Sequence, residues 1–213
     1  MHINWQQREL QLKIVYYGPA LSGKTTNLEQ IYARVEPDHR RVRLTGMEPL
    51  DAFIADHDGI ITTAQARRCG LSRDQIRHRI TSGHWQAVGR GVYLCADHHL
   101  TEAARFRAAV ALHHGVADRT SAAWWHGMLD ELPPAITVSV PRTAHGARSS
   151  ALLTDVVRRS YPAEDVEVIR DVPVTRRPLT VLAAAAEVAD GIGLFDRQLQ
   201  IGAVTVPALH RAA

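Results

Sequence analysis

Residues 59–95 read GIITTAQARRCGLSRDQIRHRITSGHWQAVGRGVYLC, and this stretch decides how most of the chain folds. It contains two capping boxes, T-x-x-Q at residues 62–65 and S-x-x-Q at residues 72–75, and each predicts the start of a helix. The first helix should end at Gly70 and the second at Gly83, because glycine is favoured directly after a helix. Two short helices joined by a glycine-containing turn are typical of a helix-turn-helix.

A β-hairpin is predicted directly after the second helix. Residues 85–88 and 92–95 read as two strands, and Gly89-Arg90-Gly91 supplies the turn between them. Upstream, residues 49–55 read as a short helix with Leu50, Phe53 and Ile54 on one face. A helix-turn-helix that is followed by a hairpin indicates a winged helix, in which the second helix of the pair enters the major groove of DNA.

The charge of this stretch favours DNA as the partner. Between Gly59 and Cys95 there are six arginines and one acid, which gives a local charge of +5 on a chain whose net charge is +3. The candidate DNA-binding residues are Arg67, Arg68, Ser72, Arg73, Gln75, Arg77, His78 and Arg90. We assign Arg73, Gln75, Arg77 and His78 to base edges, and Arg67, Arg68 and Arg90 to phosphates. The alternative is that these arginines form an ordinary solvated face.

Four sequence blocks within this stretch carry a family resemblance. They are DGIITTAQA at 58–66, GLSRDQIR at 70–77, SGHW at 82–85 and RGVYL at 90–94. In their order and spacing they resemble the type IV toxin–antitoxin AbiEi-family antitoxins, and the resemblance extends over residues from about 47 to 213. It implies a repressor that binds double-stranded operator DNA upstream of a toxin–antitoxin pair, with a toxin that does not contact the antitoxin directly.

The remainder of the chain, residues 98–213, predicts a small mixed α/β region. Helices are predicted at 101–114, 121–127 and 179–188, and strands at 135–141, 156–157 and 166–169. The order of segments resembles the middle part of AbiEi-like proteins. The helix after Val174-Thr175 usually carries an Arg and, four residues later, an Asp, whereas this chain has Leu179 and Ala183. Any polar contact made by that pair is therefore in doubt here.

A phosphate-binding motif stands near the N-terminus. Residues 12–17 read as a buried strand, residues 18–25 (GPALSGKT) fit G-x-x-x-x-G-K-[ST], and residues 26–35 read as a helix. The candidate nucleotide-binding residues are Gly18, Gly23, Lys24, Thr25 and Thr26. In a working site the backbone N–H groups surround phosphate oxygens, Lys24 reaches the outer phosphates and Thr25 binds Mg²⁺. The cofactor would be GTP or ATP with Mg²⁺.

The same segment, over about residues 1–43, resembles the start of the MglA-type bacterial small GTPases. The resemblance then stops, and no N-K-x-D base-recognition motif occurs in the chain. One strand and one helix cannot bury their own apolar faces, so we favour a truncated P-loop fragment and expect no bound cofactor. GTP or ATP binding at Gly18–Thr25 is the alternative. A fusion at or near Met47, natural or artificial, explains the junction most simply.

Together these patterns predict an α+β chain in three parts: a strand–P-loop–helix fragment at 1–46, a winged helix-turn-helix at 47–97 and an α+β antitoxin-like region at 98–213. The sequence has no apolar run of membrane-spanning length and no basic segment followed by an apolar core at the start, so we expect a cytoplasmic protein without a membrane partner. No nucleophile-plus-base or metal-ligand spacing stands out, and we expect no enzymatic activity.

Overall fold

The computed structural model describes residues 2–4, 9–11, 50–143 and 152–213. The chain divides into two compact units, Met1–Gly46 and Met47–Ala213. In the first unit β1 (His2–Asn4) and β2 (Glu9–Gln11) pair antiparallel. The predicted strand at 12–17, the P-loop and the helix at 26–35 lie outside the described residues.

The second unit begins with the predicted winged helix. Its elements are α2 (Leu50–Asp56), β3 (Ile60–Thr62), α3 (Thr63–Arg68), α4 (Arg73–Thr81), β4 (Trp85–Gly89) and β5 (Val92–Cys95). The three strands form an antiparallel sheet in the order β3-β5-β4. The three helices and the hairpin confirm the prediction, whereas strand β3 was not predicted.

Both capping boxes form as the sequence predicts. The Thr62 hydroxyl accepts from the Gln65 N–H at 3.1 Å, and the Gln65 side chain accepts from the Thr62 N–H at 2.8 Å. Ser72 and Gln75 repeat the arrangement at 3.2 and 2.8 Å. Each box supplies partners to N–H groups that a helix start otherwise leaves without one, and so fixes where α3 and α4 begin.

The rest of the second unit is built on a mixed five-stranded sheet in the order β8-β7-β6-β10-β9. The strands are β6 (Val116–Ala117), β7 (Ile136–Val140), β8 (Thr154–Arg158), β9 (Val166–Ile169) and β10 (Val172–Thr175). The helices are α5 (Glu102–His113), α6 (Arg119–Trp125), α7 (Arg177–Ala185), α8 (Gly191–Gln200) and α9 (Val206–Ala212), with a 3-10 turn at Ala163–Asp165. Strands β6 and β10 and helices α8 and α9 were not predicted.

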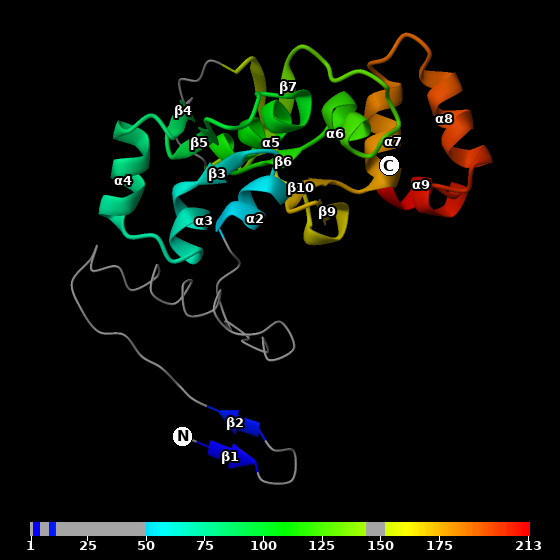
Figure 1. The fold of residues 1–213 in the computed structure, drawn as a ribbon. Coiled ribbons are helices and arrows are strands. Elements are labelled where there is room, and N and C mark those ends of the chain that lie inside the picture. The colour runs from blue at the N-terminus through cyan, green and yellow to red at the C-terminus, as the bar shows by residue number, and fades with distance from the viewer. Residues whose placement is uncertain (1, 5–8, 12–49, 144–151) are drawn as a thin grey trace. The chain divides into compact units, whose positions relative to one another are not determined.

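Helix α5 joins the two sheets through one apolar core. Ile60 of β3 belongs to the same buried cluster as Phe106 of α5 and Val138 of β7. On the other side of the small sheet, Ile76 of α4 and Trp85 of β4 lie in a second cluster beneath the helices of the winged helix. Helices α6 to α9 enclose a third cluster, and Figure 1 places α7, α8 and α9 at the end of this unit opposite α4. None of the helices in the described ranges is long and apolar enough to span a bilayer.

Candidate nucleic-acid interface

Helix α4 presents its charged side chains to solvent. Arg73, Arg77 and His78 are exposed, while Ile76 is buried in the core beneath the helix and Ile80 packs against it. The amphipathic spacing of the sequence therefore orients the helix as predicted. The side chains of Ser72 and Gln75 are half-buried and occupied by the capping box, which leaves Arg73 and Arg77 as the outermost cations of this helix.

The side chains of the exposed arginines of the winged helix have no ion-pair or hydrogen-bond partner among the described residues. This holds for Arg73 and Arg77 on α4, for Arg67 and Arg68 at the end of α3, and for Arg90 in the β4–β5 turn. Unneutralised guanidinium groups on a protein surface are available to phosphate and to guanine O6 and N7. The positive charge of these arginines is therefore exposed to solvent and is not neutralised by acidic side chains of the described residues.

The sixth arginine of the stretch has a different role. Arg79 is half-buried, and its guanidinium carbon lies 5.7 Å from the centre of the Trp85 ring. This cation–π contact covers the buried tryptophan and connects α4 to β4. Arg79 therefore stabilises the helix that carries Arg73 and Arg77.

The wing is held against the start of α3. The Thr63 N–H donates to the Gly91 carbonyl at 2.9 Å, which ties the β4–β5 turn to the helix-turn-helix. Gly91 has φ +75°, a left-handed conformation that glycine adopts without strain. This turn leaves the adjacent Arg90 exposed next to the helix-turn-helix.

A shallow hollow of about 360 Å³ lies beside α4. Its lining residues are Thr63, Arg73, Ile76, Arg77, Ile80 and Thr81. The two isoleucines give it an apolar floor and the two arginines add positive charge. A surface of this character suits a nucleic-acid backbone or base edge, which combines anionic phosphates with apolar sugar and methyl groups.

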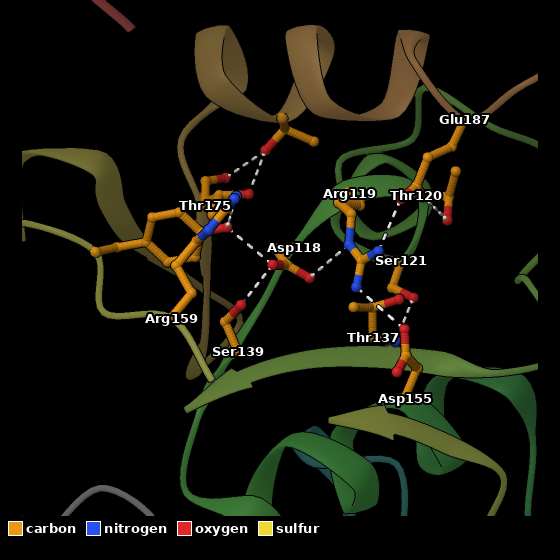
Figure 2. A network of polar contacts seen from close by, with 12 residues as sticks. Asp118, Arg119, Thr120, Ser121, Thr137, Ser139, Asp155, Arg159, Thr175 and Glu187 are labelled. Carbon is orange, nitrogen blue, oxygen red and sulfur yellow. Dashed lines mark hydrogen bonds and ion pairs between the residues drawn. The ribbon is translucent and has the colours of Figure 1, made fainter. Parts of the chain in front are cut away.

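A second polar cluster, which no sequence motif indicated, is centred on Asp118 (Figure 2). Asp118 is 1% exposed, and its Oδ2 accepts hydrogen bonds from the Ser139 hydroxyl at 2.6 Å and the Tyr161 hydroxyl at 2.8 Å. Its Oδ1 has no hydrogen-bond donor and lies 3.6 Å from Nε of Arg119. These residues are far apart in the sequence, which explains why no local spacing pointed to them.

Arg119 connects the buried Asp118 to acidic side chains at the surface. Its backbone has φ +52°, and its guanidinium donates to Glu187 at 2.8 Å and to Asp155 at 3.1 Å. Burial is the largest influence on the pKa of Tyr161 and raises it, so the phenol stays protonated and continues to donate to Asp118. The cluster connects the end of β6 to β7, to β8 and to the residues after α7, and we assign it a structural role.

The described residues hold no cluster of three histidine, cysteine or acidic side chains that could bind a metal ion. Cys69 and Cys95 are both buried, and neither forms a disulfide. Burial raises the pKa of the Cys95 thiol to about 11, which keeps it protonated and unreactive near neutral pH. The proposed nucleotide-binding residues, from Gly18 to Thr26, lie outside the described residues.

Two comparisons with individual proteins bear on different parts of the chain. The mutual gliding-motility protein MglA of Myxococcus xanthus (strain DK1622) is 67% identical over 30 residues, which is 14% of this chain and 15% of that protein's length. The match thus covers a small fraction of an MglA chain. The crystal structure of the RV2827C protein from Mycobacterium tuberculosis is 18% identical, with a TM-score of 0.46, and the match covers 76% of this chain and 68% of that one.

Family models match most of the second unit. Residues 48–96, which contain the winged helix, match the family described as "Transcriptional regulator, AbiEi antitoxin". Residues 103–200 match the family described as "AbiEi antitoxin C-terminal domain". Both matches are to AbiEi antitoxin models, as the sequence resemblance implied, but the region that was compared with the middle part of such proteins matches their C-terminal domain. Across these residues the chain belongs to the AbiEi antitoxin family.

Proposed function

We propose that this protein is a DNA-binding repressor and antitoxin of a type IV toxin–antitoxin system. The observation that carries the proposal is the set of exposed arginines on α4, whose side chains have no partner among the described residues and stand on the second helix of the helix-turn-helix. The description of the matching family as a transcriptional regulator supports the same function. The proposed partner is a double-stranded operator upstream of the toxin and antitoxin genes.

In this proposal α4 lies in the major groove. Arg73, Arg77 and His78 contact base edges there. Gln75 uses its side-chain oxygen in the capping box, so its amide nitrogen makes the base contact. Arg67, Arg68 and Arg90 contact phosphates on either side and fix the register of the helix. Ser72 both caps the helix and stands at its entry to the groove, where its backbone N–H is already satisfied by Gln75.

The experiment that tests this function is a binding titration. Duplexes from the region upstream of the gene are labelled, and their affinity is measured by fluorescence anisotropy for the wild-type chain and for Arg73→Ala/Arg77→Ala. We expect specific binding by the wild type and its loss in the double variant. Arg197→Ala is the matched control, because Arg197 is an exposed arginine on α8, away from the winged helix. Equal affinity of the double variant and the wild type would reject the assignment of α4.

Nucleotide binding at the P-loop is the second candidate, and the 30-residue match to MglA favours it. The site would be formed by Gly18, Gly23, Lys24, Thr25 and Thr26, with Mg²⁺ on Thr25. Titration of labelled GTP and ATP with Mg²⁺ tests it, and micromolar binding that Lys24→Ala abolishes would establish it. Because the proposed DNA surface lies in the second unit, we expect Lys24→Ala to leave operator affinity unchanged.

A further inference from the structure

We propose that Arg107 is a positioning residue, which holds the winged helix in a fixed orientation on the C-terminal region and thereby sets its DNA-binding surface. The inference rests on the proposed DNA-binding function. Arg107 belongs to α5, outside the winged helix, and is 5% exposed. Its Nε donates to Oδ2 of Asp58 at 3.1 Å, and Asp58 lies in the turn between α2 and β3 of the winged helix.

The same guanidinium also binds the turn between β9 and β10. Nη1 of Arg107 donates to the Arg170 carbonyl at 2.7 Å. The Trp125 ring stacks against both arginines, with the guanidinium carbon of Arg107 at 5.6 Å and that of Arg170 at 3.7 Å from its centre. One buried cation therefore connects three segments: the α2–β3 turn, α5 and the β9–β10 turn.

A second contact joins the same two turns. The His57 ring stacks on Phe53 at 3.8 Å, its Nδ1 lies 2.7 Å from the Phe53 carbonyl, and its Nε2 faces Oδ2 of Asp171 at 3.3 Å. His57 is buried, whereas the Asp171 side chain is 73% exposed. The α2–β3 turn of the winged helix thus contacts the β9–β10 turn directly through His57 and Asp171, and Arg107 connects the neighbouring Asp58 and Arg170.

The backbone at this junction is held in an uncommon conformation. Asp58, Arg170 and Asp171 have φ of 55°, 49° and 60°. Non-glycine residues in this left-handed region persist where surrounding contacts determine them. Gly59, the next residue, packs so closely on His98 that a Cβ at this position would lie 2.4 Å from the His98 Cβ. The conformation of the α2–β3 turn is therefore determined by the Arg107 contact at Asp58 and by the close packing of Gly59 on His98.

The chemistry of the contact favours a positioning role over a simple contribution to stability. A buried ion pair gains little over well-packed apolar side chains, but it is directional and permits one geometry. Arg107 donates one hydrogen bond to Asp58 and another to the Arg170 carbonyl, and both bonds form together only when the two turns keep their positions relative to α5. If DNA binding and the geometry of this junction are coupled, each must influence the other by the same factor.

The test uses the full chain and compares Asp58→Ala with Asp58→Asn. Alanine removes the acceptor for Arg107, while asparagine keeps an oxygen at the same position and tolerates the left-handed backbone. Hydrogen–deuterium exchange is measured on free protein and on protein with operator DNA, together with operator affinity. We expect Asp58→Ala to speed exchange in the β9–β10 hairpin about tenfold and to weaken operator binding at least fivefold, and Asp58→Asn to restore both.

The outcomes separate this inference from the proposed function. If the wild type binds no DNA, the proposed function fails, and exchange in the free protein still decides whether Asp58 and the β9–β10 hairpin are coupled. Unchanged exchange and affinity in Asp58→Ala would overturn the positioning role. Should Asp58→Ala fail to fold, Arg107→Lys replaces it, because lysine keeps a cation at this position but lacks the planar fork that donates to Asp58 and to the Arg170 carbonyl together. Operator DNA then protects the β9–β10 hairpin in the wild type and not in the variant; equal protection in both overturns the inference.

Discussion

Individual arginines in this protein fall into two groups that differ in their partners. Arg107 and Arg119 are ion-paired inside the fold, and Arg79 covers a tryptophan. Arg73 and Arg77 have no such partner among the described residues and remain exposed. The residues with free charge are those that an external anion can bind, which is why the proposed function is assigned to them.

The first prediction contrasts two exposed arginines. Arg77→Ala removes a side chain assigned to a base edge, so it should relax preference at one operator position by about 1–3 kcal/mol. Arg90→Ala removes a side chain assigned to phosphate, so it should weaken binding to all duplexes about equally. Competition between the operator and single-base variants of it measures both. A uniform loss in Arg77→Ala would contradict its assignment to a base.

The second prediction concerns the pH dependence of stability. Burial lowers the pKa of His126, which packs neutral with its Nε2 donating to the Thr175 carbonyl at 2.8 Å. Because the unfolded chain then binds more protons, this contribution to stability is complete above about pH 6.5 and is lost as the pH falls below it. His126→Gln should flatten the pH dependence of the free energy of unfolding between pH 7 and 5. An unchanged slope in urea unfolding would contradict this account.

At the scale of the element, a helix start is determined by a few local side chains. We predict that Ser72→Ala lowers the free energy of unfolding by about 1 kcal/mol, because it removes the cap of α4. Ser72→Asn retains a capping oxygen and should be close to the wild type. Denaturant unfolding of the two variants measures the difference. Equal stability of Ser72→Ala and the wild type would show that α4 does not depend on its cap.

Elements with a strong local signal were predictable from the sequence. The capping boxes and the glycines that follow each helix predicted α3 and α4, and the glycine-rich turn predicted the β4–β5 hairpin. Strand β3 has three residues, the last of which, Thr62, is also the N-cap of α3, and a strand of this length is too short for alternation to be visible. Its pairing with β5 is a long-range contact that no local pattern encodes. Strand β6, with two residues, escaped prediction for the same reason.

At the scale of the whole second unit, the winged helix shares its core with the C-terminal region. Ile60 is 1% exposed and packs in the cluster that contains α5 and β7. We predict that Ile60→Ala lowers the free energy of unfolding by about 2–5 kcal/mol and shifts a single transition of this unit. Ile60→Val should cost about 0.5–1.5 kcal/mol. A transition that splits, with β7 to β10 unaffected, would contradict a shared core.

The polar contacts that join distant segments of the second unit could not be predicted from local patterns. Arg107 meets Asp58 and Arg170, and Asp118 meets Ser139 and Tyr161. Nothing in the spacing of these residues distinguishes them from solvated side chains, and only the packing of α5 and the five-stranded sheet brings them together. The candidate DNA surface, by contrast, comes from one continuous stretch and was visible in the sequence.

The salt dependence of binding tests the central claim most directly. Affinity for the operator and for an unrelated duplex is measured from low to high salt, for the wild type and for Arg73→Ala/Arg77→Ala. Each lost phosphate contact lowers the slope of log affinity against log salt by about 0.9, while a lost base contact lowers operator preference. Because Arg73 and Arg77 are assigned to base edges, the account predicts that the double variant loses its operator preference and binds both duplexes with similar affinity. A double variant with the wild-type slope and the wild-type operator preference would contradict it.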